Sequence, residues 1–312
     1  MLLEREIYGW IYSYNGNGFN IIPNESFDHP QILYKLYALN QFSFDSLINQ
    51  YVYATHPSQF NDIFDCNEEL LDFDNDSIRI FLKDFFTKEK LERLIKEDIV
   101  NLRLFTQRLF REILYKKWGV FSMTGNPNNI LMWSYYSHHS GFCIEFDISK
   151  FPFKFFGPFP VNYQPTLEAI SLKNIGLQIG VLAQCNLKDE IWKHEQEWRL
   201  MIAAPDGEDM VSKSDQLLKG HDGHNRKFHY PLEAIQSISL GNRFFIPDEI
   251  KEINSRELEI NLMSDIKRKS KMLSFLSKNK IKTHIGLRVG FTEIKFKVIE
   301  IQKVGYKKFL IK

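Results

Sequence analysis

Two glutamates and an arginine occupy alternate positions near the middle of the chain, at Glu195, Glu197 and Arg199. The surrounding segment, Trp192 to Ile202, has the pattern of a β-strand, in which alternate side chains share a face. The charged residues would then line one face, and the opposite face, which includes Trp198, would pack against the core. Carboxylates held close together can have their pKa values pushed apart, as general acid and base catalysis requires. The competing interpretation is a solvated strand face with an ion pair of little energetic value.

Short polar residues follow an earlier predicted strand, which spans residues 51–55. Asn61 and Asp62 come after this strand and after Pro57, which stops it. Loops at strand ends often carry functional residues. Asn and Asp also hydrogen-bond to their own backbone, so turn formation explains the same residues equally well.

An aromatic and histidine cluster lies within and just after a predicted helix at residues 132–137. Trp133 and Tyr136 are three residues apart and share a helical face, and His139 follows them. A flat aromatic surface beside a histidine could clamp a nucleobase or a nicotinamide ring. Core packing is the stronger interpretation for Trp133 and the weaker one for Tyr136 and His139.

Five short motifs occur in a fixed order along the chain. They are Leu33-Tyr34-Lys35, Phe60-Asn61-Asp62 through Phe64-Asp65-Cys66, Met132-Trp133 with Tyr136, Gly141 through Cys143-Ile144-Glu145-Phe146-Asp147, and Glu195 with Glu197-Trp198-Arg199. Together they resemble a bacterial domain-of-unknown-function family with the hallmarks L-Y-K-Y, F-N-D-P-F-D, M-W-x-x-Y, G-x-C-I-x-F-D and E-x-E-W-R. This chain departs from the hallmarks at Leu36 and Ile63, and neither departure removes a polar group.

The resemblance implies a divergent relative of the ADP-ribosyltransferase fold, in a toxin or phage-defence setting. Such enzymes bind NAD in a cleft between two antiparallel sheets, and NAD would be a substrate rather than a resident cofactor. By position, Glu197 would be the catalytic glutamate and Glu195 would orient the acceptor. Tyr34 and Lys35 would lie at the ribose or phosphate end, with Tyr136 as the stacking ring. Many transferases of this fold have His or Arg where this chain has Tyr-Lys.

Two other functions remain open. Asp62, Asp65, Glu195 and Glu197 could instead hold a hard metal in a nuclease-like or hydrolase site, because carboxylates suit such ions. A non-catalytic module that senses a ligand in the same polar cleft is the third alternative. The histidines between His221 and His229 lack the spacing of a zinc site, so no zinc ion is predicted there.

Charge is balanced over the whole chain but uneven along it. The net charge is +1, yet residues 1–75 hold two basic and eleven acidic residues, and residues 264–312 hold fourteen basic and three acidic residues. The basic end could bind nucleic acid, or it could simply face the acidic half. The N-terminus lacks a signal-peptide pattern, no apolar run is long enough to span a membrane, and the three cysteines lack metal spacing. We therefore expect a cytoplasmic protein with reduced thiols that binds a small nucleotide and no membrane; the sequence does not indicate its oligomeric state.

The elements that would position these residues predict a mixed α+β fold with mostly antiparallel sheets around a cleft. Residues 1–30 are predicted to be an irregular extension, and residues 31–312 a single domain. Apolar residues at helical spacing predict a helical insertion at about 77–117, with two helices joined near Thr87. Strands are predicted at 32–37, 118–124, 141–148, 235–240, 284–288, 293–302 and 307–311, and helices at 44–50, 166–188, 248–261 and 265–278.

Overall fold

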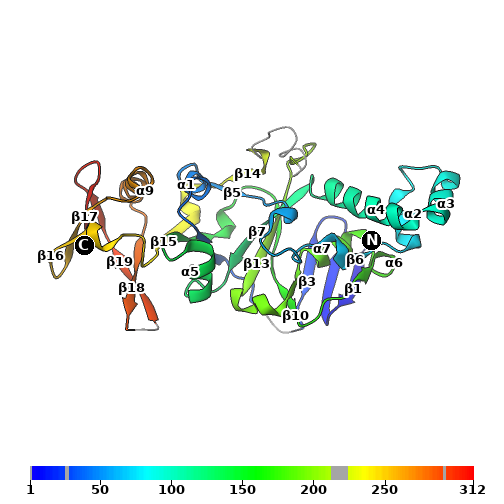
Figure 1. Cartoon of the computed structure of the whole chain (residues 1–312), viewed down its shortest axis with the longest axis horizontal. Helices are drawn as coiled ribbons and strands as arrows, with labels where there is room; N and C mark the ends of the chain where they lie inside the picture. The colour runs from blue at the N-terminus through cyan, green and yellow to red at the C-terminus, as the bar shows by residue number, and fades with distance from the viewer. Residues whose placement is uncertain (1, 25–27, 212–223, 291–292) are drawn as a thin grey trace.

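The computed structural model describes residues 2–24, 28–211, 224–290 and 293–312 (Figure 1). Its centre is an eight-stranded sheet with the order β19-β18-β15-β8-β4-β7-β13-β9. The strands are β4 (Ile32–Tyr37), β7 (Trp118–Thr124), β8 (Phe142–Asp147), β9 (Phe155–Pro160), β13 (Glu197–Ala203), β15 (Ile235–Leu240), β18 (Thr283–Val289) and β19 (Glu293–Ile299). Within this sheet β15 and β18 pair in parallel and the other described pairs are antiparallel. The predicted α+β class with mostly antiparallel sheets is confirmed.

The strands next to the centre of the sheet match the sequence prediction. β4, β7 and β15 have the predicted bounds, because each is rich in β-branched and aromatic residues and ends near a turn-forming residue. Almost every residue of β7 is buried, on both of its faces. β7 therefore lies between packed layers and carries no solvated face.

The N-terminal residues form a sheet, which corrects the prediction of an irregular extension over 1–30. β1 (Leu3–Ile7), β2 (Trp10–Tyr14) and β3 (Phe19–Ile22) form an antiparallel three-stranded sheet. Gly16 has φ +91°, so the turn-rich run after Tyr12 is a hairpin turn between β2 and β3. The Tyr12 side chain is fully buried.

The helical insertion is confirmed, but it contains three helices in place of two. α2 (Asn75–Leu82), α3 (Lys88–Glu97) and α4 (Ile99–Leu114) begin after the N-cap residues Asp74, Thr87 and Asp98. Asp98 ends α3 and caps α4 at once, and this break was not apparent from the apolar spacing. The buried faces of these helices pack around Phe110.

The predicted helix over 166–188 is shorter and broken. The segment contains β11 (Ile170–Ser171), α6 (Leu172–Ile175), α7 (Leu177–Gln184) and β12 (Leu187–Asp189). Gly176, at φ +80°, separates the two helices, and β12 pairs in parallel with β10 (Asn162–Gln164). The last residues of the segment are therefore extended and can reach the central sheet.

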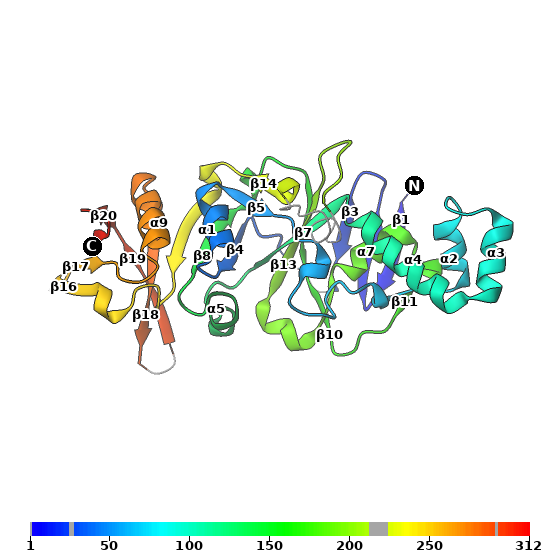
Figure 2. The same cartoon turned by 45° about the horizontal axis from the view of Figure 1, so that its top comes forward.

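The C-terminal part is a second small sheet with one helix. β16 (Ile250–Asn254) and β17 (Glu257–Asn261) form a hairpin, so the prediction of a helix over 248–261 is wrong. They join β20 (Ile301–Lys303) and β21 (Lys308–Ile311) in the order β16-β17-β21-β20, and α9 (Ile266–Lys278) confirms the predicted basic helix. Both views place this part at the end of an elongated molecule opposite to α2, α3 and α4 (Figures 1 and 2).

The remaining elements connect these parts. They are α1 (Gln41–Ile48), β5 (Tyr51–Tyr53), β6 (Leu71–Asp72), α5 (Ile130–Ser137) and β14 (Lys227–His229), with β6 pairing β11 and β14 pairing β5. α5 packs on β4 at the middle of the chain. No helix in the described residues has the length and apolar character needed to cross a bilayer.

Candidate functional site

The stretch around Glu195 is only partly the predicted strand. Residues Glu190–Glu195 form a 3₁₀ helix, Gln196 adopts the left-handed conformation at φ 46°, and β13 begins at Glu197. The face of β13 that carries Arg199 is buried, because Arg199 is 1% exposed and Glu197 is 6% exposed. The interpretation of a solvated charged face is therefore wrong. On the opposite face Leu200 and Ile202 are fully buried, whereas Trp198 is only half-buried.

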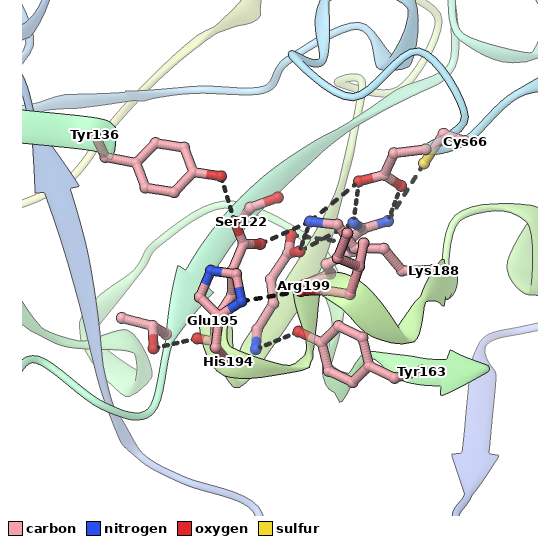
Figure 3. A network of polar contacts seen from close by, with 12 residues as sticks. Cys66, Ser122, Tyr136, Tyr163, Lys188, His194, Glu195 and Arg199 are labelled. Carbon is pink, nitrogen blue, oxygen red and sulfur yellow. Dashed lines mark hydrogen bonds and ion pairs between the residues drawn. The ribbon is translucent and has the colours of Figure 1, made fainter. Parts of the chain in front are cut away.

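Five buried residues form a charge cluster beneath this strand: Asp65, Lys188, Glu195, Glu197 and Arg199 (Figure 3). Lys188 Nζ donates to Glu195 Oε2 at 2.7 Å and to Glu197 Oε2 at 2.9 Å. Arg199 Nε donates to Glu197 Oε1 at 2.9 Å, and Arg199 Nη1 donates to Asp65 Oδ1 at 2.8 Å. Each carboxylate therefore contacts at least one cation inside the protein.

Electrostatics in the charge cluster favours the ionised forms. Burial alone would raise the pKa of Glu197, but Arg199 and Lys188 outweigh it and hold that pKa well below its usual range. Burial would lower the pKa of Lys188, yet the surrounding carboxylates, Glu197 first, hold it above its usual value. With three carboxylates and two cations, the charge cluster carries a formal excess of one negative charge.

A third cation approaches the charge cluster from β4. Lys35 Nζ donates to the Ser122 carbonyl at 2.6 Å and lies 5.3 Å from the centre of the Phe121 ring. Burial lowers the pKa of Lys35, and the charges of Glu197 and Glu195 oppose this shift. The Lys35 ammonium is thus positioned to offset the excess negative charge.

A pocket of about 350 Å³ opens beside the charge cluster. Aromatic rings and polar groups share its wall, and the lining includes Tyr34, Lys35, Phe60, Asn61, Asp65, Thr124, Met132, Tyr135, Tyr136, Lys188, Glu195 and Glu197. Tyr136 Oη donates to Glu195 Oε1, and burial, together with the Glu195 charge, raises the pKa of Tyr136. Figure 3 shows this hydroxyl pointing at the Glu195 carboxylate. The rings of such a wall can stack on a flat ring of a ligand, and its polar groups can bind the hydroxyl donors of that ligand.

Residues far apart in sequence meet at this pocket. Six of the candidate residues line it, from four separate segments: Tyr34, Lys35, Asn61, Tyr136, Glu195 and Glu197. The sequence pattern predicts polar residues at strand ends, but it offers no packing reason for them to gather. Their convergence makes the pocket the candidate site.

Four other candidate residues lie outside the pocket lining. Trp133 is buried in the core, and its Nε1 donates to the Pro127 carbonyl at 2.7 Å. Asp62 Oδ1 accepts from the Phe64 amide at 3.0 Å, which is the turn-forming alternative. His139 follows the end of α5 at φ 58°. Arg199 is absent from the pocket lining and pairs with Asp65 and Glu197.

Arg199 is enclosed by the protein on all of its donor groups. Besides its carboxylate partners, Nη1 donates to the Cys185 carbonyl at 2.8 Å and contacts Cys66 Sγ at 3.4 Å. Nη2 also donates to Glu197 Oε2 at 3.1 Å. Arg199 therefore positions Glu197 and does not itself face a ligand.

Two residues of the site were not found from sequence. Lys188 lay in a segment predicted to be helical, where a single lysine gives no signal. Tyr163 accepts a hydrogen bond from the Glu197 amide at 2.9 Å and follows a Phe- and Pro-rich stretch without periodicity. Asp65 was predicted only as a metal ligand, although its place in the Asn61 to Asp65 motif also indicated a residue of the site.

The carboxylates are arranged for cations of the protein and not for a metal ion. Within the described residues, no group of three or more His, Cys, Asp or Glu side chains is placed to hold a metal. Lys188 and Arg199 occupy the positions between Asp65, Glu195 and Glu197, and Asp62 lies outside the charge cluster. Three of the four carboxylates of the metal-dependent alternative are therefore paired with cations of the protein.

The histidine-rich loop is described only in part. His221 lies outside the described residues, as does most of that loop. His229 is exposed, and its Nδ1 lies 3.0 Å from the Asn49 carbonyl. His229 therefore plays no part in the candidate site.

In the comparison with protein families, residues 132–200 match the family described as protein of unknown function (DUF2971). Neither curated proteins nor solved structures gave a match. The matched span runs from α5 to β13 and includes Tyr136, Lys188, Glu195 and Glu197. The part of the pocket wall that carries Glu195 and Glu197 thus lies in the span over which this chain is similar to DUF2971 proteins.

Proposed function

We propose that the pocket binds a nucleotide of the NAD type and that the protein is an NAD-consuming enzyme related to the ADP-ribosyltransferases. One observation carries the proposal: a pair of carboxyl side chains, Glu195 and Glu197, shares one pocket with aromatic rings and buried lysines. The resemblance of the five motifs supports the same fold and activity. Neither the fold family nor the activity follows from the α+β architecture alone.

The pocket wall suggests how such a nucleotide would lie. The rings of Tyr135 and Tyr136 offer flat surfaces for the nicotinamide ring, and Tyr34, which lies with Lys35 on β4, would be at the ribose or phosphate end. Lys35 lies on the β4 side and would attract the phosphates. The carboxylates of Glu195 and Glu197 would then face the ribose between the two.

The proposed reaction breaks the bond between ribose C1′ and the nicotinamide nitrogen. The electron pair leaves with the nicotinamide, and positive charge develops on the ribose ring as an oxocarbenium-like centre. The Glu197 carboxylate, held ionised by Arg199 and Lys188, would stabilise this charge. Water or another hydroxyl acceptor then attacks C1′ and loses its proton. Glu195, hydrogen-bonded to Tyr136, would orient that acceptor.

Release of free nicotinamide from NAD tests the proposal. We expect release by the wild-type protein that EDTA leaves unchanged. Glu197→Gln should lower the rate by at least about 10²-fold, a loss near 2.7 kcal/mol of transition-state stabilisation. Because the partners of Glu197 are buried, rates are compared per folded molecule, with folding followed by thermal melting. Glu252→Gln, which changes an exposed glutamate on β16, is the matched control and should keep full activity.

The contrary outcomes are distinct. A folded Glu197→Gln variant that retains the wild-type rate would refute the catalytic assignment. Cleavage of DNA or RNA that EDTA abolishes, without nicotinamide release, would favour the metal-dependent alternative. Growth arrest on expression, relieved by Glu197→Gln, would support the toxin or phage-defence setting that the resemblance implies.

A ligand-sensing module is the second candidate function, and one observation favours it. Both oxygens of Glu197 already accept hydrogen bonds from Arg199 and Lys188, as a purely structural carboxylate would. In that case NAD or a related nucleotide would bind with measurable heat and remain intact. Calorimetry and nicotinamide release on the same sample separate the two functions.

Nucleic acid is a candidate partner through the C-terminal part. Lys267, Lys271 and Lys278 are exposed on α9 at spacings of four and seven residues, which place them on one side of the helix. Such a row of ammonium groups fits a phosphate backbone. Binding of this kind should weaken steeply as salt concentration rises.

A further inference from the structure

A second pocket, of about 210 Å³, adjoins the first and shares Tyr34 with it. Its floor is a polar row that crosses four neighbouring strands of the central sheet. Tyr34 on β4 pairs with Glu145 on β8, and Glu145 pairs with Ser237 on β15. One step along, Cys143 pairs with Ser239, which pairs with His284 on β18. The row is thus built by strand register and not by a flexible loop.

Glu145 carries the charge of this pocket. Its carboxylate accepts hydrogen bonds from two neutral hydroxyls, Ser237 Oγ and, at 3.5 Å, Tyr34 Oη. No ion pair joins Glu145 to any cation among the described residues, in contrast to the carboxylates of the charge cluster. A half-buried carboxylate without a cationic partner attracts a positively charged group.

His284 leaves an unused position beside this carboxylate. Its Nδ1 is buried and has no hydrogen-bond partner in the described structure. Burial and, to a smaller extent, the Lys282 ammonium lower the pKa of His284, and the charge of Glu145 opposes this shift without reversing it. A neutral imidazole nitrogen can accept a hydrogen bond from a ligand.

Pro127, Asn128 and two aromatic rings complete the wall of this pocket. Tyr34 and Phe296 line the pocket, and the Phe296 ring lies 5.2 Å from the Trp133 ring, which holds it in place. A planar cation gains from stacking on such rings, and its N–H groups can donate to a carboxylate in pairs. A guanidinium group meets both requirements, whereas a compact ammonium group uses the flat walls less well.

We propose that this second pocket is a binding site for an alkylguanidinium group, held by Glu145 between the rings of Tyr34 and Phe296. The site is separate from the nucleotide reaction and does not depend on it. Because Tyr34 lines both pockets, a ligand in one would restrict the ring that the other uses.

Calorimetric titration with n-butylguanidinium, in the absence of NAD, tests this site. The wild-type protein should bind n-butylguanidinium and should bind its neutral isostere n-butylurea at least about tenfold more weakly. Glu145→Gln keeps the side-chain shape and should reduce guanidinium affinity at least about tenfold while leaving the weak urea binding unchanged. Glu252→Gln removes an exposed charge elsewhere and should bind like wild type.

Each result of these titrations either supports or overturns the guanidinium site. Equal affinity for the two ligands, equal guanidinium affinity in a folded Glu145→Gln variant, or no binding of guanidinium to wild type would overturn the site. Ser239→Ala is a second variant that keeps Glu145 and its hydroxyl partners, and it should weaken binding by a smaller factor if the ligand reaches that hydroxyl. Failure of NAD turnover would not affect any of these measurements.

Discussion

Two buried groups of acidic and basic side chains in this molecule differ in which groups donate hydrogen bonds to their carboxylates. In the C-terminal part, Glu249 is fully buried, and its Oε2 accepts from Lys269 Nζ at 2.8 Å. Backbone amides also donate to this carboxylate: Met263 N and Ser264 N donate to Oε1 at 2.8 and 2.7 Å, and Ile246 N donates to Oε2 at 3.1 Å. These hydrogen bonds lower the pKa of Glu249 to about 2, against burial, which raises it.

In the charge cluster around Glu197 the donors to the carboxylates are side chains instead. They cover one side of the cluster, and the first pocket borders the other. Its members come from residues as distant as Asp65 and Arg199, and Glu195, Glu197 and Lys188 border the first pocket. Backbone donors fix a carboxylate in a loop, whereas long side chains leave one face available to a ligand. Burial and pairing are common to both groups, and the adjoining first pocket distinguishes the charge cluster from the group around Glu249.

Arg199→Met should have the largest effect on stability and tests this difference. The change leaves Asp65 and Glu197 buried without the guanidinium that pairs them, and removal of one partner from a buried ion pair costs about 3–5 kcal/mol. Urea unfolding of the variant should show that loss. Arg93→Met, which breaks an exposed pair with Glu97, is the matched control and should change stability by less than about 1 kcal/mol. A loss below 1 kcal/mol for Arg199→Met would mean that the charge cluster relaxes by admitting water.

Glu249→Gln should separate structure from ligand binding. The amide keeps an acceptor oxygen but weakens several charge-assisted hydrogen bonds, so we expect a loss of about 2 kcal/mol in the free energy of unfolding. Affinity for NAD should remain at the wild-type value, because Glu249 does not line the first pocket. Parallel measurements of unfolding and of nucleotide binding check this, and a selective loss of binding would contradict the comparison.

Acid should weaken both groups, and Glu249 makes the effect measurable. Its pKa is about 2 when folded, below the value of about 4.3 in an unfolded chain, so its contribution is complete above pH 4.3. It is lost as pH falls from there towards 2, at no more than about 1.4 kcal/mol per pH unit for one group. The lowered pKa of Glu197 acts in the same direction. Urea unfolding at pH 5, 4 and 3 should show a shallower decline for Glu249→Gln than for wild type; identical slopes would count against the pairing.

Tyr136→Phe should give the smallest change in stability. It removes the hydroxyl that donates to Glu195 but keeps the ring, so we expect a loss of about 1 kcal/mol. If the ring stacks on the ligand, nucleotide affinity should survive while nicotinamide release slows, because the acceptor is then poorly oriented. Tyr135→Phe changes a more exposed tyrosine of the same wall and serves as the control. Equal effects of the two changes on nicotinamide release would remove the special role of Tyr136.

Much of the central sheet could be predicted because its signals are local. β4, β7 and β15 are short runs of apolar and β-branched residues between turn-forming residues, and α9 has a clear apolar stripe. Periodicity also predicted which side of β13 would be apolar. The candidate pocket followed in part from the motif order, which brought together Tyr34, Asn61, Tyr136 and Glu197.

Other features depend on contacts that the local sequence does not carry. Residues 250–261 hold three Glu, one Lys and one Arg, which favour helices, yet β17 pairs with β21 and this pairing overrides propensity. The break at Gln196 needs a left-handed residue, and Gln does not signal one. Lys188 joins the charge cluster because Gly176 and Cys185 interrupt the helix that the apolar run predicted.

The pairing of β15 with β18 has a consequence for the newly made chain. β15 leaves the ribosome well before β18, because residues 241–282 separate them, and until β18 arrives one edge of the growing sheet exposes unpaired amides and carbonyls beside Ile238 and Leu240. Such an edge can pair with an edge of another unfinished molecule. Pairing of β18 with β15 therefore ends the interval in which this edge of the sheet is open to self-association.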